Sequence, residues 1–182
     1  MKKQLLFVIS LLSIFLISAC DDKTETVDDR WKIENEAQFN IIVNDPEYKQ
    51  LNSLAGNGFI MYKVLKTGTG DRSPAFNEQV KALHFGWYKN IWTKPDTFTD
   101  EKGNFITNKI DFDKANRDRA RTFYVNNNIE GFRTALQYMK EGDRWEIWIP
   151  WKLGYGAMGD GPIKGYTTLV FEIELEKIIE EL

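Results

Sequence analysis

Few side chains in this sequence could do nucleophilic or metal chemistry. The chain has one cysteine, Cys20, and one histidine, His84. One cysteine excludes a disulfide within the chain, and these two residues cannot supply the roughly four ligands of a structural zinc site. A Ser-His-Asp triad could use only His84, which lies inside an alternating strand pattern. There we expect a histidine that is packed or faces a sheet edge.

One polar group is presented by a turn, the phenol of Tyr155 within residues 153–156. The stretch before it must position it, and its first half follows a helical period. Hydrophobic residues recur there at three- and four-residue spacing, which predicts a helix with one apolar face: Ile129, Phe132, Ala135, Leu136 and Met139. Gly142 is expected to end this helix, with Lys140 favourably placed in its last turn.

Two strands are predicted to accompany this helix. Residues 144–149 alternate in character, and Pro150 ends the run. Residues 169–175 alternate between apolar side chains and glutamates, as in an antiparallel strand with one buried face. The sequence therefore predicts a short helix packed against a sheet, with the Tyr155 turn beside it.

These residues, in this order, resemble the FKBP-type peptidyl-prolyl isomerases. The family motif reads roughly V-I-x-G-W-x-x-A-L-x-x-M-x-x-G, then I-P-x-x-L-A-Y-G, G-x-I-P-P and L-V-F-x-V-E-L. The corresponding residues here are Ile129-Glu130-Gly131-Phe132, Ala135-Leu136, Met139, Gly142, Ile149-Pro150, Leu153-Gly154-Tyr155-Gly156, Gly161-Pro162-Ile163 and Leu169 to Leu175. The resemblance covers roughly residues 58–180.

The resemblance implies an α+β fold, in which a twisted antiparallel sheet of about five strands wraps around one short helix. It implies rotation about X-Pro bonds in an apolar pocket without nucleophile, metal or cofactor. By position, the catalytic residues would be Phe132 as the floor, the Tyr155 hydroxyl and Asp113. The Ile129 backbone N–H would be a further polar contact, and the substrate-binding walls would be Phe85, Phe112, Phe123, Ile129, Ile163 and Phe171.

Two assignments in this set depend on register. Phe85 falls where the family has the tyrosine of its H-Y-T-G motif. The family's Phe-Asp pair could be Phe98 with Asp100, or Phe112 with Asp113. We prefer the second, because it lies at the right distance before residues 122–126, which resemble the family's T-F-x-V-N. Residues 89–110 then form an insertion, which we expect to be an extended hairpin.

Three positions depart from the family pattern. Phe132 stands where the family usually has tryptophan, Asn128 stands at a usually apolar position, and Ile163-Lys164-Gly165 replaces I-P-P. Phenylalanine keeps an aromatic floor, whereas the change at residues 163–165 alters the flap over the pocket.

The N-terminus reads as a targeting segment. Lys2 and Lys3 precede an apolar run, and residues 17–20 end in small residues followed by Cys20. This pattern resembles a bacterial lipobox, in which cleavage precedes a cysteine that then receives lipid; an ordinary secretory signal is the alternative. Several acyl chains would anchor the protein stably, since each buried methylene contributes about 0.8 kcal/mol.

We therefore divide the chain into a signal peptide (1–19), a lipidated cysteine with an acidic tether (20–30), a helical extension (31–57) and the isomerase-like domain (58–182). Within the extension we expect a helix over 31–43, capped by Asp28 or Asp29, with Trp31, Phe39 and Ile42 along one face. A second short helical piece through Leu51 is also expected.

The leading hypothesis is a lipid-anchored isomerase in the envelope of a Gram-negative bacterium, at the outer membrane, which assists the folding of exported proteins. Its partners would be proline-containing polypeptides and, through Cys20, the membrane; we expect a monomer. The net charge of −3 falls to −5 without Lys2 and Lys3, which argues against a nucleic-acid partner. The alternative is a non-catalytic FKBP-like binding module, whose tryptophans would form a platform for a peptide or glycan.

Overall fold

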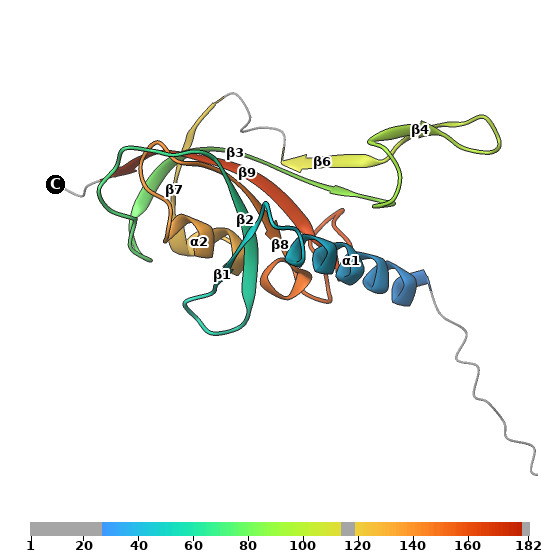
Figure 1. Ribbon diagram of the computed structural model, residues 1–182, viewed down its shortest axis with the longest axis horizontal. Coiled ribbons are helices and arrows are strands. Elements are labelled where there is room, and N and C mark those ends of the chain that lie inside the picture. The colour runs from blue at the N-terminus through green and yellow to red at the C-terminus, as the bar shows by residue number, and fades with distance from the viewer. Residues whose placement is uncertain (1–26, 114–118, 180–182) are drawn as a thin grey trace, which may run out of the picture.

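The computed structural model describes residues 27–113 and 119–179 of the chain (Figure 1). The expected signal peptide and Cys20 lie outside the described residues. The expected tether lies largely outside as well, but its last residues, from Val27, already belong to a helix.

Seven antiparallel strands form one twisted sheet in the described part of the chain. They follow the order β1-β2-β8-β9-β3-β6, and β7 pairs with the other half of β3 (Figure 1). The α+β fold expected from the resemblance is confirmed, with more strands than the expected five. The strands are β1 (Lys49–Asn52), β2 (Phe59–Lys66), β3 (Gln79–Lys89), β6 (Lys109–Asp113), β7 (Arg121–Tyr124), β8 (Arg144–Ile149) and β9 (Leu169–Ile179).

The helix α2 (Glu130–Leu136) packs into one face of this sheet. It ends before Met139, earlier than predicted, and Gly142 follows in the left-handed region with φ +88°. Two 3₁₀ turns, Val125–Asn127 and Trp151–Leu153, lie before α2 and after β8. The core consists of fully buried side chains from α2, the turn after it and the sheet: Ile60, Val80, Ala135, Leu136, Met139, Ile147, Ile149, Leu169, Ile173 and Leu175.

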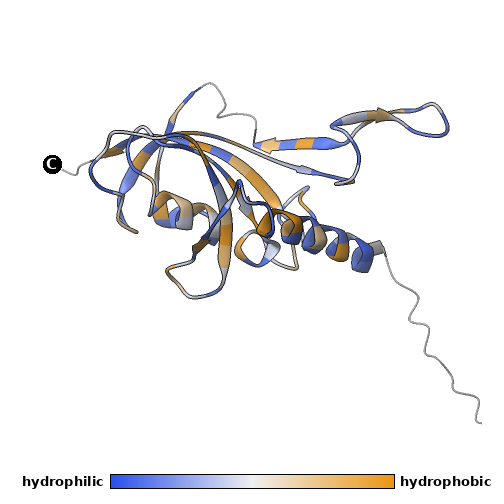
Figure 2. Cartoon of the chain, viewed as in Figure 1, coloured by the Kyte–Doolittle hydropathy of each residue, from blue (hydrophilic) through white to orange (hydrophobic). Residues whose placement is uncertain are grey.

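The helix α1 (Val27–Val43) contributes to both faces of the sheet. Its first turns place Trp31 in the main core, beside Tyr88, whereas Phe39 and Ile42 pack with Met61, Trp148 and Val170 in a second cluster. Figure 2 shows long hydrophobic stretches in β9 and both colours alternating along α1. No helix in the described ranges is long and apolar enough to cross a membrane.

Two details of the extension differ from the prediction. Asp28 and Asp29 lie inside the first turn of α1, where a negative charge suits the helix dipole, and neither precedes the helix as a cap. The piece before Leu51 is the strand β1, paired with β2, and not a helix. Pairing with an existing strand edge satisfied the backbone groups of a segment too short to form a stable helix by itself.

The insertion over residues 89–110 contains the expected hairpin, formed by β4 (Thr97–Thr99) and β5 (Phe105–Thr107). It extends away from the sheet and runs directly into β6 (Figure 1). Asn108 fixes its base, since its fully buried amide donates to the carbonyls of Ile91, Lys94 and Pro95.

Candidate active site

A hollow of about 230 Å³ lies between α2, the start of β9, the end of β6 and the turn after β8. Five of its nine lining residues carry an aromatic ring, and Asp113, Asn127 and Asn128 add polar side chains. The lining residues are His84, Phe112, Asp113, Asn127, Asn128, Ile129, Phe132, Tyr155 and Phe171. Six of the nine residues expected from the sequence are among them.

Phe132 lies at the centre of the ring contacts. Its side chain is 3% exposed, and its ring meets Phe171 edge-to-face at 5.1 Å and His84 at 5.3 Å between centroids. The preceding Gly131 explains its depth. A Cβ at Gly131 would lie 2.4 Å from Cγ2 of Ile149, so only glycine lets α2 approach β8 this closely.

A bulge in β6 turns two consecutive residues toward the hollow. Gly86 pairs with Asp113 and Trp87 pairs with Asp111, which leaves Phe112 as the extra residue. Without the bulge, neighbours on a strand would face opposite sides of the sheet. Asp100, the alternative aspartate, caps the β4–β5 turn instead, where its carboxylate accepts from the backbone N–H groups of Lys102 and Asn104.

His84, expected from the sequence as a packed or edge-facing histidine, is packed as expected and also lines the hollow. Its Nε2 lies 3.0 Å from Oδ2 of Asp113, and its ring meets Phe123 and Phe132. Phe85, the residue expected in the pocket, faces the opposite side of the sheet with Arg144 and Glu172. The expected register was wrong by one residue, and in a strand that moves a side chain to the other face.

A signal for the correct register was present in the sequence. The H-Y-T-G motif ends in glycine, two residues after its tyrosine. Aligning that glycine with Gly86 places His84, and not Phe85, at the position of the tyrosine.

Tyr155 comes to the hollow from the turn after β8. Its pKa is raised above the usual tyrosine range, first because burial disfavours the phenolate and then because Asp160 and Asp113 carry negative charge nearby. The hydroxyl therefore stays protonated and able to donate a hydrogen bond well into the alkaline range.

The remaining expected residues lie close to the hollow but do not line it. Phe123 supports Phe132 from behind, with 6.1 Å between ring centroids, and Ile163 is buried in the main core. Of the three departures from the family pattern, Asn128 lines the rim and its amide donates back to the carbonyls of Tyr124 and Val125. Lys164 points to α1 instead, with its Nζ 5.6 Å from the centre of the Trp31 ring.

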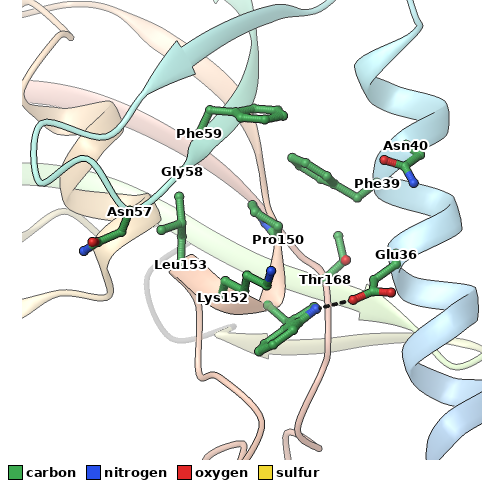
Figure 3. A pocket seen from close by; sticks show the side chains of 11 residues that line it. Glu36, Phe39, Asn40, Asn57, Gly58, Phe59, Pro150, Lys152, Leu153 and Thr168 are labelled. Atoms are coloured by element: carbon green, nitrogen blue, oxygen red, sulfur yellow. Dashed lines mark hydrogen bonds between the residues drawn. The ribbon is translucent and has the colours of Figure 1, made fainter.

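A second hollow lies between α1 and the turn after β8 (Figure 3). It has a volume of about 350 Å³, and its polar contact is the bond between Glu36 and the indole of Trp151. Within the described ranges it offers no paired acid and base, and no group of three or more metal-ligating side chains occurs there or elsewhere.

The tryptophans of the outer face do not form a flat row. Trp87 and Trp148 meet at 78°, while Trp92 is tilted by 48° and 41° against these two rings. Trp148 is also buried, with 6% exposure. This arrangement is typical of packing, and it removes the flat platform on which the binding-module alternative depended.

The aromatic hollow can hold a flat apolar group and can place hydrogen-bonding groups at its edge. Comparison with known proteins agrees with this geometry. Residues 98–176 match the family described as FKBP-type peptidyl-prolyl cis-trans isomerase. The chain is 31% identical over 133 residues to the peptidyl-prolyl cis-trans isomerase Mip of Coxiella burnetii, covering 72% of this chain and 48% of that protein.

Two further relatives extend the comparison. The chain is 30% identical over 118 residues to the outer membrane protein MIP of Legionella longbeachae, covering 64% of this chain and 42% of that protein. A crystal structure of a peptidyl-prolyl cis-trans isomerase from Pseudomonas syringae superposes with a TM-score of 0.60 at 25% identity, over 86% of this chain and 99% of that one. The chain spans about half the length of the curated relatives that it matches. The chain thus has the FKBP-like fold, and its residues 98–176 match the FKBP-type peptidyl-prolyl cis-trans isomerase family.

Proposed function

We propose that this protein is a peptidyl-prolyl cis-trans isomerase, anchored through lipid on Cys20, that assists the folding of exported proteins. The single observation that carries the catalytic part is the aromatic hollow, which joins Phe132, Tyr155 and Asp113 around one space. The family match and the names of the relatives support the same activity.

The reaction is rotation about the bond before proline. Its barrier is high, about 18–20 kcal/mol for a peptide bond, because resonance makes C–N partly double. The twisted state has lost that resonance, and its carbonyl dipole is smaller. An apolar hollow therefore binds the twisted state better than the planar state, which water solvates well, and this differential binding is catalysis.

The proposed roles follow from the positions of the side chains. Phe132 is the floor beneath the proline ring, and Phe112 and Phe171 are the walls, with Phe123 behind the floor. The Tyr155 hydroxyl donates to a substrate carbonyl, and the Ile129 backbone N–H lies at the start of α2 as a second donor. Asp113 holds the polar edge together with His84 and does not act as a base, because the reaction transfers no proton.

The proposed location rests on the sequence and on the name of one relative. Cys20 ends an apolar run, as in a lipobox, and a similar protein from Legionella longbeachae is named an outer membrane protein. We infer an envelope protein of a Gram-negative bacterium, held at the outer membrane by acyl chains, whose partners are proline-containing polypeptides.

The test is an isomerisation assay with the full-length chain purified in detergent. The substrate is a peptide with an apolar residue before proline, and cis-to-trans conversion is followed with and without protein. We expect acceleration over the uncatalysed rate. Protein that is folded by circular dichroism, yet leaves the rate unchanged at micromolar concentration, would overturn the catalytic part of the proposal.

A further inference from the structure

We propose that Asn35 of α1 is a positioning residue for the isomerase site. Together with Trp31 and Glu36, it fixes the loop over residues 154–168, which carries Tyr155. The inference rests on the proposed function, because Tyr155 belongs to the site proposed above. It assigns to α1, which lies outside the matched family segment, a role in the geometry of that site.

The loop has little structure of its own to fix its position. Five of its fifteen residues are glycines, which leave the backbone conformationally free. The strand-like pairing described within it is the single bridge between Asp160 and Ile163. Backbone bonds within the loop join Gly159 to Tyr155 and Tyr166 to Gly156, but contacts with other parts of the protein place the loop as a whole against the fold.

Asn35 supplies the most buried of these contacts. Its side chain is fully buried, and its amide oxygen accepts from the backbone N–H of Thr168 at 2.9 Å and from the indole of Trp92 at 3.1 Å. Its amide nitrogen donates to the carbonyl of Trp31, and its own carbonyl accepts from the Thr168 hydroxyl. A buried amide is stable only when paired, so these bonds specify where the end of the loop lies on α1.

Trp31 adds a hydrogen bond to a residue within the loop. Its indole N–H donates to the carbonyl of Gly165 at 3.0 Å. A Cβ at Gly165 would lie 1.9 Å from the carbonyl oxygen of Ala157, so the two arms of the loop are in direct contact. The next residue, Tyr166, donates its N–H to the carbonyl of Gly156, the immediate neighbour of Tyr155.

Glu36 is linked to Tyr155 indirectly, through Trp151. Its carboxylate accepts from the indole of Trp151 at 2.9 Å, the dashed line in Figure 3. The carbonyl of Trp151 in turn accepts from the N–H groups of Gly154 and Gly156, which flank Tyr155. Both neighbours of the catalytic phenol are therefore bonded to residues that α1 holds.

The backbone conformation of Tyr166 indicates that contacts around the loop impose its conformation. Tyr166 is the one non-glycine residue in the described ranges with positive φ, at 62°. Such a conformation persists only where the surroundings impose it. Here the Tyr166 ring packs edge-to-face on Trp151, with Nζ of Lys32 from α1 5.4 Å from its centre.

The test compares three full-length proteins: wild type, Asn35→Ala and Ile42→Ala. Ile42 is the matched control, because it is buried on the same helix but packs with Met61, Trp148 and Val170 and not with the loop. We expect Asn35→Ala to lower kcat by up to about tenfold, no more than removal of the Tyr155 hydroxyl itself, with little change in KM, because misplacing a catalytic group by about 1 Å is costly. Ile42→Ala should lower the unfolding midpoint comparably and leave kcat near wild type.

Amide hydrogen exchange provides a readout that loss of stability alone would not reproduce. In Asn35→Ala the N–H groups of Gly156 and Tyr166 should exchange faster, while those of β8 and β9 keep their protection. If Asn35→Ala does not fold, two substitutions of the partly buried Glu36 test the same role. Glu36→Ala should lower kcat, and Glu36→Gln, which keeps an oxygen for Trp151, should restore it.

The outcomes separate the two levels of proposal. An active wild type with unchanged kcat in both Asn35→Ala and Glu36→Ala would overturn the positioning role alone. A parallel decline of kcat in Ile42→Ala would overturn it as well, because stability would then explain the loss. An inactive wild type would overturn the proposed function, and with it this role of Asn35.

Discussion

The imidazole of His84 and the carboxylate of Asp113 meet across two paired strands, with Nε2 3.0 Å from Oδ2. Both side chains are largely buried, at 12% and 24% exposure. The imidazole also packs edge-to-face on Phe123 and Phe132, so the polar edge of the hollow and its aromatic floor share one side chain.

Replacing His84 should therefore disturb the polar edge without emptying the hollow. His84→Phe keeps an aromatic ring against Phe132 but removes the bond to Asp113. We expect kcat/KM to fall about tenfold, the equivalent of roughly one hydrogen bond to a charged group. For Asp113→Asn, which keeps an acceptor for His84, kcat/KM should fall less. A His84→Phe protein with wild-type kcat/KM would show that Asp113 does not depend on this bond.

Phe132 should matter most for catalysis. Phe132→Ala removes the floor and admits water, so we expect the largest loss of kcat/KM among single changes in the hollow. Its unfolding free energy should also fall by about 3–5 kcal/mol, the usual cost of truncating a buried phenylalanine. Phe132→Leu, which keeps an apolar floor, should retain more of both quantities in isomerisation assays and denaturant titration. Equal activity of the two variants would contradict the assignment.

The pKa of Tyr155 predicts a flat pH profile on the alkaline side. Burial, Asp160 and Asp113 all disfavour the phenolate, so the folded pKa lies above the unfolded one. The contribution of the Tyr155 phenol to the stability of the folded protein is thus fully present below the unfolded pKa of about 10. It is lost only as pH rises through the higher folded pKa. Between pH 8 and 10, kcat/KM should stay constant in the wild type.

Tyr155→Phe is the control for this profile. Its kcat/KM should be lower by the equivalent of one neutral hydrogen bond, about 0.5–1.5 kcal/mol, and equally flat. A decline in the wild type with a midpoint below pH 10, absent from Tyr155→Phe, would place the tyrosine pKa in its ordinary range.

Leu136 tests the packing of α2. It is fully buried against the sheet, so Leu136→Ala should lower the unfolding free energy by about 2–5 kcal/mol. Tyr138, just beyond the helix and 40% exposed, is the matched control, and Tyr138→Ala should cost far less. Denaturant titration of both proteins measures the difference. A near-zero loss for Leu136→Ala is incompatible with the observed core.

Cys20 tests the proposed anchor in cells. Cys20→Ser should release mature protein from the membrane fraction or leave the precursor uncleaved, because serine offers no sulfur for the acyl chain. Fractionation and acyl labelling report both results. Unchanged membrane recovery together with unchanged labelling would exclude the lipoprotein assignment.

The sequence predicted the central helix and the strands around it because their periodicity is local. The apolar face of α2, and the alternation in β8 and β9, can be recognised without knowing their partners. The order of motifs then indicated the FKBP-type fold, which the structure confirms. β1 was missed because its strand conformation depends on β2, a partner that no local pattern reveals.

The lining of the hollow was predictable only in part, for a related reason. Alternation along residues 79–89 indicates that Leu83, Phe85 and Trp87 share a face, but it does not indicate which face meets α2. The bonds of Asn35 to Thr168 and Trp92 could not be foreseen, because they join residues far apart in the chain.

Gly86 influences the shape of the hollow because it has no Cβ. A Cβ at this position would lie 2.6 Å from both Cζ of Phe112 and Cε1 of Phe171, whose rings cross directly over the backbone of β3. The rings of Phe112 and Phe171 therefore pack directly on the backbone of β3 at this position. Even one added methyl group would force both rings to move, so the absence of a Cβ at residue 86 fixes how closely these two walls of the hollow approach β3.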